Sequence, residues 1–271
     1  MSFVELTPLV WQSAFIALIA FLLVFIDAPK MRRLKQFTSS VARLAALRTS
    51  ILALWGFAAL ALVLASPNDL FVVRLVGADM AWLHGNSVVM AISVAILVIW
   101  FSLLFVPGLH CAMRPEARQK YWGAMQSLLH ILPVAARERR WWVLASITAG
   151  VCEEVLFRGF LQQFLQGQLH GGWTLNPTSA WLLSALAFGL SHFYQGAAGI
   201  ARTALAGLMF GLLAAVSGSL LLPIVLHVLV DLAVLWVYRP QLDYPAAAMR
   251  LMQGCSPALA TDGKQGDSTQ A

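Results

Sequence analysis

Long apolar segments, one after another along the chain, restrict the fold more than any other feature of the sequence. An α-helix rises about 1.5 Å per residue, so about 20 apolar residues cross the hydrocarbon core of a bilayer. Segments of this kind run from about 9 to 26, 49 to 65, 87 to 105, 141 to a linker that starts at 166, 179 to 193, 200 to 216, and 220 to 238. Hydrophobic residues make up 60% of the chain and charged residues only 11%, whereas soluble domains carry about 25% charged residues. We therefore expect an all-α fold, a polytopic transmembrane helix bundle with about seven spans, within a range of six to eight.

The basic residues between these segments predict how the chain lies in the membrane. They cluster after the first and third segments, as Lys30, Arg32, Arg33, Lys35, Arg43 and Arg48, and then as Arg114, Arg118, Lys120, Arg137, Arg139 and Arg140. Because cytoplasmic loops carry the excess of Lys and Arg, we expect the N-terminus outside and the C-terminus in the cytosol of a plasma (inner) membrane. No basic residue precedes the first segment, which favours a retained helix over a cleaved signal peptide. The net charge of +6 reflects this loop pattern and gives no indication of nucleic-acid binding.

The same pattern divides the chain into three parts. Residues 1–140 are expected to hold N-terminal transmembrane helices, basic cytosolic loops and, from Tyr121 to Leu132, an interfacial amphipathic helix. Residues 141–240 are expected to form a helix core that holds the buried polar residues. Residues 241–271 are expected to be a cytosolic, largely disordered tail, because small and polar residues dominate it after Gly254.

Three charged side chains, Glu153, Glu154 and Arg158, lie inside the apolar segment that starts at 141. A charge at bilayer depth costs about 2.5–3.5 kcal/mol on insertion scales, so each of them needs a partner. Residues four apart share a helix face, which allows Glu154 and Arg158 to form a charge-assisted pair. Glu153 points about 100° away and has no local cation, which suits a general base. A purely structural ion-pair cluster is the alternative interpretation.

Two histidines in later apolar segments are candidate partners for Glu153. Phe188 and His192 share one face of the fifth segment, and His227 and Asp231 share one face of the last segment. A histidine near a helix end is often only a packing residue, and a buried His-Asp pair can be a satisfied polar clamp. For the two histidines to meet Glu153, the fifth helix must extend beyond Phe193 or lie deeper in the membrane than its sequence position suggests.

Two hydrolytic chemistries fit these residues. In the first, Glu153 takes a proton from water, His192 shares or relays it, and His227 donates to the oxyanion on a peptide carbonyl. In the second, Glu and His side chains bind a metal ion that activates the water. No His-Glu-x-x-His motif is present and Arg158 would repel a cation, so we favour a site without metal or other cofactor. Two functions of other classes use the same residues: a non-catalytic immunity or scaffold protein, and a proton-coupled transporter.

The ordered set of motifs resembles one protein family. Glu153-Glu154-x-x-x-Arg158, Phe188-x-x-x-His192 and His227-x-x-x-Asp231, on separate apolar segments, look like the CAAX protease and bacteriocin-processing (CPBP, or Abi) family, which includes the type II CAAX prenyl endopeptidases. The resemblance covers about 141 to 238. It implies a helix bundle around a cavity, a catalytic CPBP-like core over 141–240, and metal-free, glutamic-type intramembrane proteolysis. The implied partners are the bilayer and a membrane-associated protein or peptide substrate, lipidated or not.

The resemblance also implies roles for individual residues. Glu153 would activate the water with help from His192. Glu154 and Arg158 would form a structural pair, with Phe188 as a supporting residue. His227 would contribute to the oxyanion site. The prenyl endopeptidases have Asn four residues after the last His, where this chain has Asp231. An ionised Asp cannot donate a hydrogen bond as an amide can. Asp231 is therefore interpreted either as protonated or as the residue that orients His227, and a prenylated substrate, a leader peptide and a C-terminal sorting helix all stay open.

Overall fold

The computed structural model shows a protein built from α-helices, and it describes residues 3–36, 39–65, 81–114, 116–117, 130–167, 169 and 174–237. The longer helices are α1 (Phe3–Leu22), α2 (Ala28–Gln36), α3 (Ser40–Ala65), α5 (Ser87–Met113), α7 (Ala136–Glu154), α9 (Pro177–Ser191), α10 (Ala197–Ser217) and α11 (Leu221–Val237). The shorter elements are α4 (Ala81–His84), α8 (Gln162–Leu165), the π-helical turns η1 (Leu23–Asp27) and η3 (Val155–Leu161), and the 3-10 turn η4 (Phe193–Gln195). The described residues contain no strand, and the expected all-α membrane helix bundle is confirmed.

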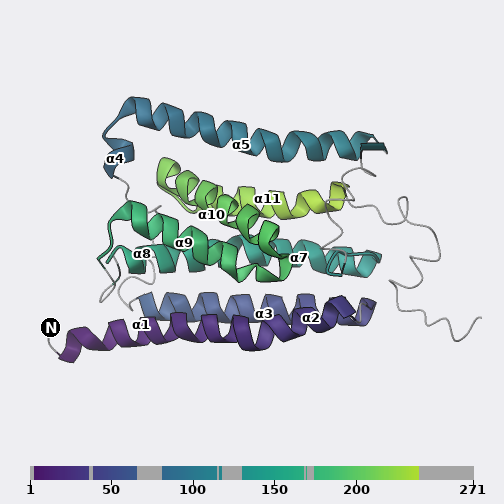
Figure 1. Ribbon diagram of the computed structural model, residues 1–271, viewed down its shortest axis with the longest axis horizontal. Coiled ribbons are helices and arrows are strands. Elements are labelled where there is room, and N and C mark those ends of the chain that lie inside the picture. Colours follow the sequence, from purple (N-terminus) through teal and green to yellow (C-terminus); the bar gives the residue numbers. More distant parts are fainter. Residues whose placement is uncertain are drawn as a thin grey trace, which may run out of the picture.

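The helices are arranged in layers (Figure 1). One outer layer is α5, the opposite outer layer is formed by α1, α2 and α3, and α7, α9, α10 and α11 lie between them. The contacts between elements agree, because α5 packs against α10 and α11, and α7 packs against both α11 and α3. The helix that carries Glu153 and Glu154 is therefore enclosed between other helices.

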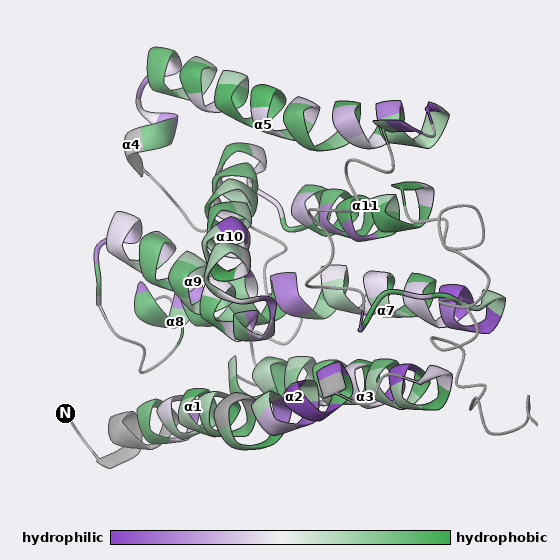
Figure 2. Cartoon of the chain, turned by 45° about the vertical axis from the view of Figure 1, so that its right-hand side comes forward, coloured by the Kyte–Doolittle hydropathy of each residue, from purple (hydrophilic) through white to green (hydrophobic). Residues whose placement is uncertain are grey.

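Apolar side chains face outward from the outer layers, as expected of helices in contact with lipid. Leu52, Ile99 and Leu103 are examples of large hydrophobic residues that are exposed. Figure 2 shows α1, α3 and α5 as largely hydrophobic, whereas α2 and the start of α7 are hydrophilic. Among the described residues, four helical segments are long and apolar enough to cross a membrane: Leu9–Lys35, Ser40–Ala65, Ser87–Met113 and Ala197–Ser217.

The remaining core helices differ from these four for physical reasons. α11 is a shorter apolar helix, and α7 carries charged residues at both ends. α9 has 15 residues and is therefore about 22 Å long, less than the hydrocarbon thickness of about 30 Å. The segment expected at 179–193 thus lies among the other helices without crossing the full bilayer by its own length.

Two expected helix ends are wrong. The first segment was expected to end near residue 26, but it passes through η1 and continues as α2, where Pro29 occupies the first turn, a position at which proline is tolerated. The third segment was expected to end near residue 105, but α5 continues through Pro107 to Met113. Proline removes one backbone hydrogen bond, whereas ending a helix in the bilayer leaves several carbonyls without partners.

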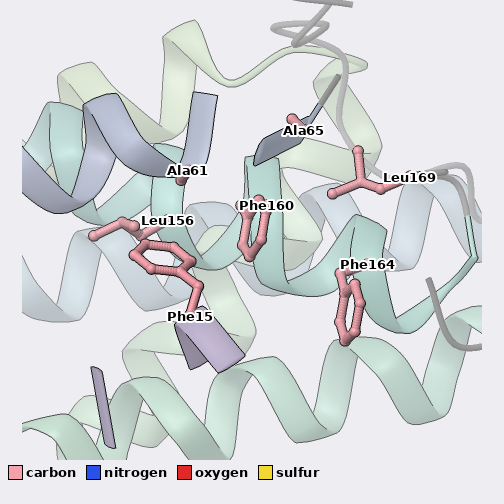
Figure 3. Packing of buried hydrophobic residues seen from close by; sticks show 7 residues of the cluster. All are labelled: Phe15, Ala61, Ala65, Leu156, Phe160, Phe164 and Leu169. Atoms are coloured by element: carbon pink, nitrogen blue, oxygen red, sulfur yellow. The ribbon is translucent and has the colours of Figure 1, made fainter. Parts of the chain in front are cut away.

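The turn after the two glutamates is anchored by an aromatic cluster that joins α1, α3, η3 and α8 (Figure 3). The cluster consists of Phe15, Ala61, Ala65, Leu156, Phe160, Phe164 and Leu169. Phe15 meets Phe160 edge-on with ring centroids 5.5 Å apart. These contacts fix the helix turn from which Arg158 projects.

A buried ion pair fixes the other end of α7. The Arg43 guanidinium donates from Nε to Glu138 Oε2 at 3.1 Å and from Nη2 to Glu138 Oε1 at 3.0 Å, and both side chains are fully buried. Glu138 Oε2 also accepts from the backbone amide of Val134 at 2.6 Å, so the same carboxylate caps the start of α7. The pair joins α3 to α7 across 95 residues of sequence.

Small residues let the core helices approach closely. A Cβ atom on Gly150 of α7 would collide with the side chain of Val228 and lie 3.2 Å from the Ile224 carbonyl of α11. A Cβ atom on Gly189 of α9 would lie 2.6 Å from the Ala204 side chain of α10. Close approach of this kind is typical of helix pairs in membranes.

Three expectations concern residues that the structure does not describe. The expected amphipathic helix from Tyr121 to Leu132 lies outside the described residues except for its end at 130–132. The expected tail at 241–271 and the loop between the second and third segments, 66–80, also lie outside them.

Candidate active site

Glu153 and Glu154 are the last two residues of α7, directly before the π-helical turn η3. A π turn adds a residue to the hydrogen-bonded ring and is frequent at functional sites. Ser184 Oγ of α9 donates to the carbonyl of Phe157 in this turn at 2.8 Å. The hydroxyl thus ties the wide turn to α9.

Glu154 is a buried acceptor shared by two cationic or polar donors. Arg158 Nη1 donates to Glu154 Oε1 at 3.0 Å, and His227 Nδ1 lies 2.8 Å from the same oxygen. The Glu154 side chain is 0% exposed. The Glu154–Arg158 pair expected from the i, i+4 spacing is present. Arg158 is not the sole partner of the Glu154 carboxylate, because His227 from α11 contacts the same oxygen.

Arg158 links three elements of the core. Besides Glu154, it donates from Nη2 to the carbonyl of Gly207 in α10 at 2.9 Å. The guanidinium lies over the Phe188 ring at 4.5 Å from its centroid, and Phe210 lies at 5.7 Å. Phe188 therefore supports the pair by a cation–π contact.

Glu153 differs from its neighbour because its side chain makes no direct hydrogen bond within the described part of the chain. Its Oε2 atom is buried and has no hydrogen-bond partner among the described residues. The nearest polar ring atoms are His192 Nε2 at 4.0 Å and His227 Nε2 at 3.9 Å, and the carboxylate side chain is 14% exposed. The structure thus brings Glu153, His192 and His227 together around one point, at separations beyond direct hydrogen bonding.

The hydrogen bonds of the two histidines set which ring atoms face Glu153. His192 Nδ1 lies 2.9 Å from the Phe188 carbonyl, which can only accept, so Nδ1 carries the proton and donates. His227 Nδ1 likewise donates to the Glu154 carboxylate. In both residues the Nε2 atom is therefore the one that faces Glu153.

The C-terminal end of α9 places His192 at the site. The helix ends at Ser191, His192 caps it, and η4 then leads directly into α10. The first of the two arrangements that the sequence allowed is not present, because α9 does not extend beyond Phe193; His192 Nε2 nevertheless lies 4.0 Å from Glu153 Oε2. Figure 1 shows the short path of α9 beside the longer α10.

Asp231 lies at the edge of this group. Its Oδ2 atom is 3.9 Å from His227 Nε2, too far for a hydrogen bond, and its side chain is 35% exposed. Its backbone carbonyl accepts from Trp142 Nε1 at 3.1 Å. The expectation that Asp231 orients His227 is not met by a hydrogen bond, because Glu154 holds the ring.

One residue near the site was missed from the sequence. The Tyr194 ring lies 5.8 Å from the His192 ring, between centroids. Its position two residues after His192 was the available signal. As to metal ions, no group of three or more His, Cys, Asp or Glu side chains in the described ranges is arranged to hold one.

Comparison with known proteins identifies the core. No curated protein and no solved structure matches the chain. Residues 136–233 match the family model described as "Type II CAAX prenyl endopeptidase Rce1-like". The matched stretch begins at the first residue of α7, ends within α11 and contains Glu153, His192 and His227. The helix core that holds this site therefore matches the CAAX protease (CPBP) family over these residues, as the motifs indicated.

Proposed function

We propose that this protein is an intramembrane endopeptidase in which Glu153 activates a water molecule for attack on a peptide bond. The observation that carries the proposal is the placement of Glu153 Oε2 at 4.0 Å from His192 Nε2 and 3.9 Å from His227 Nε2, without a direct partner among the described residues. Two atoms about 4 Å apart can both contact one water at about 2.8 Å. The angle between the two contacts at the water oxygen is then about 90°, which is acceptable hydrogen-bond geometry. We propose that such a water lies between Glu153 and the two histidines.

The reaction follows from these contacts. Glu153 takes one proton from the water, the oxygen adds to the carbonyl carbon, and the carbonyl π electrons move to its oxygen as an oxyanion. The proton held by Glu153 then passes to the leaving amide nitrogen, and the carbon–nitrogen bond breaks. The oxyanion electrons re-form the carbonyl as this bond breaks, and the products are a new carboxylic acid and a new amine; at neutral pH the acid gives its proton to the amine. His192, with its Nδ1–H held by Phe188, offers the Nε2 lone pair that helps to orient the water.

The remaining residues support this step. Arg158 compensates the charge of Glu154 and is held by Phe188, and Glu154 in turn holds His227. Donation to the oxyanion from His227 Nε2 requires protons on both ring nitrogens, and the nearby carboxylates Glu153, Glu154 and Asp231 stabilise that charge by Coulomb attraction. Asp231 lies at the edge of this group, with its side chain 35% exposed.

We further propose that the reaction needs no metal ion, because the guanidinium of Arg158 beside the carboxylates opposes a cation. Residues 141–240 act as the catalytic core, 1–140 as the helices that enclose it, and 241–271 as a cytosolic tail. The N-terminus lies outside and the C-terminus in the cytosol of the plasma membrane. The substrate is a membrane-associated protein or peptide. The family description suggests that it is prenylated, but because Asp231 stands where the prenyl endopeptidases have Asn, other lipidated or unlipidated chains are also candidates.

The test compares membranes that contain the wild type or the Glu153→Gln variant. Gln has the shape of Glu but cannot accept the proton of water. We expect at least one membrane protein to accumulate uncut with Glu153→Gln. Glu116→Gln makes the same chemical change at an exposed carboxylate and should leave cleavage unchanged. Equal cleavage with Glu153→Gln and wild type, in folded protein, would overturn the proposal.

A further inference from the structure

Tyr194 approaches the site from η4, an element that none of the three motifs includes. Lys35 Nζ of α2 donates to the Tyr194 carbonyl at 2.8 Å. The side chain also packs against the buried residues Met31, Leu34 and Ala46. On its other side the ring faces His192. Two separate parts of the chain therefore hold the half-buried phenol beside the site.

Three carboxylates act electrostatically on the phenol. Glu153, Asp231 and Asp27 are all within electrostatic range of it, and Asp27 comes from the π turn η1. None of them accepts a hydrogen bond from the hydroxyl in the described part of the chain. With an ordinary pKa near 10, a tyrosine keeps its proton at neutral pH and can act as a donor.

A short chain of hydrogen bonds sets where that proton points. Arg202 Nη2 donates to Gln195 Oε1 at 3.5 Å, and Gln195 Nε2 donates to the Tyr194 hydroxyl oxygen at 3.3 Å. Because arginine has only donors, the amide oxygen must face Arg202 and the amide nitrogen must face Tyr194. The hydroxyl oxygen is thus an acceptor for Gln195, and its O–H is directed elsewhere.

The position of Gln195 is itself restricted by the backbone. A Cβ atom on Gly199 would collide with Cβ of Gln195 and lie 3.2 Å from its Oε1. The glycine in the first turn of α10 leaves the space in which the glutamine side chain lies. The chain Arg202, Gln195, Tyr194 is therefore packed in one arrangement, with the phenol at its end.

We propose that Tyr194 is a further catalytic residue, whose O–H donates a hydrogen bond to the oxyanion that forms on the scissile carbonyl. The proposal rests on the proposed function. The reason for it lies in Asp231, which as a carboxylate accepts but does not donate, so a second donor beside His227 has to come from another residue. Tyr194 supplies that donor beside His192, within electrostatic range of Glu153 and Asp231. It gives up no proton, and the bond changes are those of the hydrolysis described above.

The test uses the full-length protein in membranes and measures the cleavage rate per folded enzyme. The probe is the set of membrane proteins that accumulate uncut with Glu153→Gln. Tyr194→Phe keeps the ring and its packing and removes only the hydroxyl. Loss of one oxyanion donor lowers the rate by about 10²–10³-fold, and we expect a loss of that size.

Two substitutions of Gln195 separate a donor from a packing residue. Gln195→Glu replaces the amide by an acceptor, which draws the Tyr194 O–H away from the site, so we expect the same loss as in Tyr194→Phe. Gln195→Met removes the amide and offers no strong acceptor, so the O–H stays available and the rate should fall only a few-fold. The double variant Tyr194→Phe/Gln195→Glu should be no slower than Tyr194→Phe.

Each result decides between the ideas. Cleavage by Tyr194→Phe at the wild-type rate, or equal losses in Gln195→Glu and Gln195→Met, would overturn the role of Tyr194 while leaving the endopeptidase proposal intact. Cleavage by Glu153→Gln at the wild-type rate would instead overturn the proposed function. If Tyr194→Phe proves unstable, the comparison of the two Gln195 variants still decides.

Discussion

Glu153→Gln and Glu154→Gln make the same chemical change at adjacent positions, and we expect very different effects on folding. Glu154 Oε1 accepts from both Arg158 and His227 in a fully buried environment. Hydrogen bonds to charged groups contribute about 1.5–3 kcal/mol each. Removing one partner of a buried ion pair costs about 3–5 kcal/mol.

The neutral amide introduced by Glu154→Gln would keep one acceptor oxygen, but it would leave the buried Arg158 charge without compensation. We therefore expect Glu154→Gln to lower the free energy of unfolding by about 3–5 kcal/mol. Because Glu153 Oε2 has no direct hydrogen bond among the described residues, Glu153→Gln should change the free energy of unfolding by less than about 1 kcal/mol.

The assay is reversible unfolding in mixed micelles of mild detergent and dodecyl sulfate, followed by tryptophan fluorescence, for which the chain has 10 tryptophans. Arg158→Met and the double variant Glu154→Gln/Arg158→Met complete a double-mutant cycle. The double variant should be more stable than the sum of the single changes predicts, because no uncompensated charge is then buried. Equal destabilisation by Glu153→Gln and Glu154→Gln would show that the whole polar cluster is structural, and the division of roles between them would be wrong.

Three further predictions concern packing, the buried ion pair and metal dependence. Gly150→Ala should lower the free energy of unfolding by about 1–3 kcal/mol. Gly56→Ala is the control, because a Cβ there meets nothing within 4 Å, and it should be neutral or stabilising by up to about 1 kcal/mol. Equal effects of the two changes in the same unfolding assay would contradict the close approach of α7 and α11. Glu138→Gln should destabilise the protein by about 3–5 kcal/mol, and the double variant Arg43→Met/Glu138→Gln should destabilise it by less. Denaturant titration of both variants measures these effects. If the effects of the two substitutions simply add in the double variant, the ion pair does not stabilise the fold. Treatment with EDTA should leave cleavage of the membrane substrates unchanged, and loss of cleavage that zinc restores would show that the site needs a metal ion.

The sequence alone determined the features that depend on local patterns. Apolar segments of about 20 residues predict membrane helices because the bilayer thickness and the helix rise set their length. The four-residue spacing of Glu154 and Arg158 predicts their pair, because a single helix turn brings them together. The order of the three motifs was enough to indicate the family of the core, which the match over residues 136–233 confirmed.

Only the tertiary structure decided which residues from different helices meet. His227 contacts Glu154, which is 73 residues away in the sequence, and not Asp231, which is four residues away. The ion pair of Arg43 with Glu138 joins residues 95 apart. Neither has a sequence pattern, because helix periodicity describes one helix at a time. The position of the end of α9, which brings His192 to Glu153, depends on close packing at Gly189 and on the turn at η4. The sequence therefore indicated the groups that we propose carry the chemistry. The packing of the helices decided that Glu154 and His227 contact each other, whereas Glu153 Oε2 has no direct hydrogen bond among the described residues.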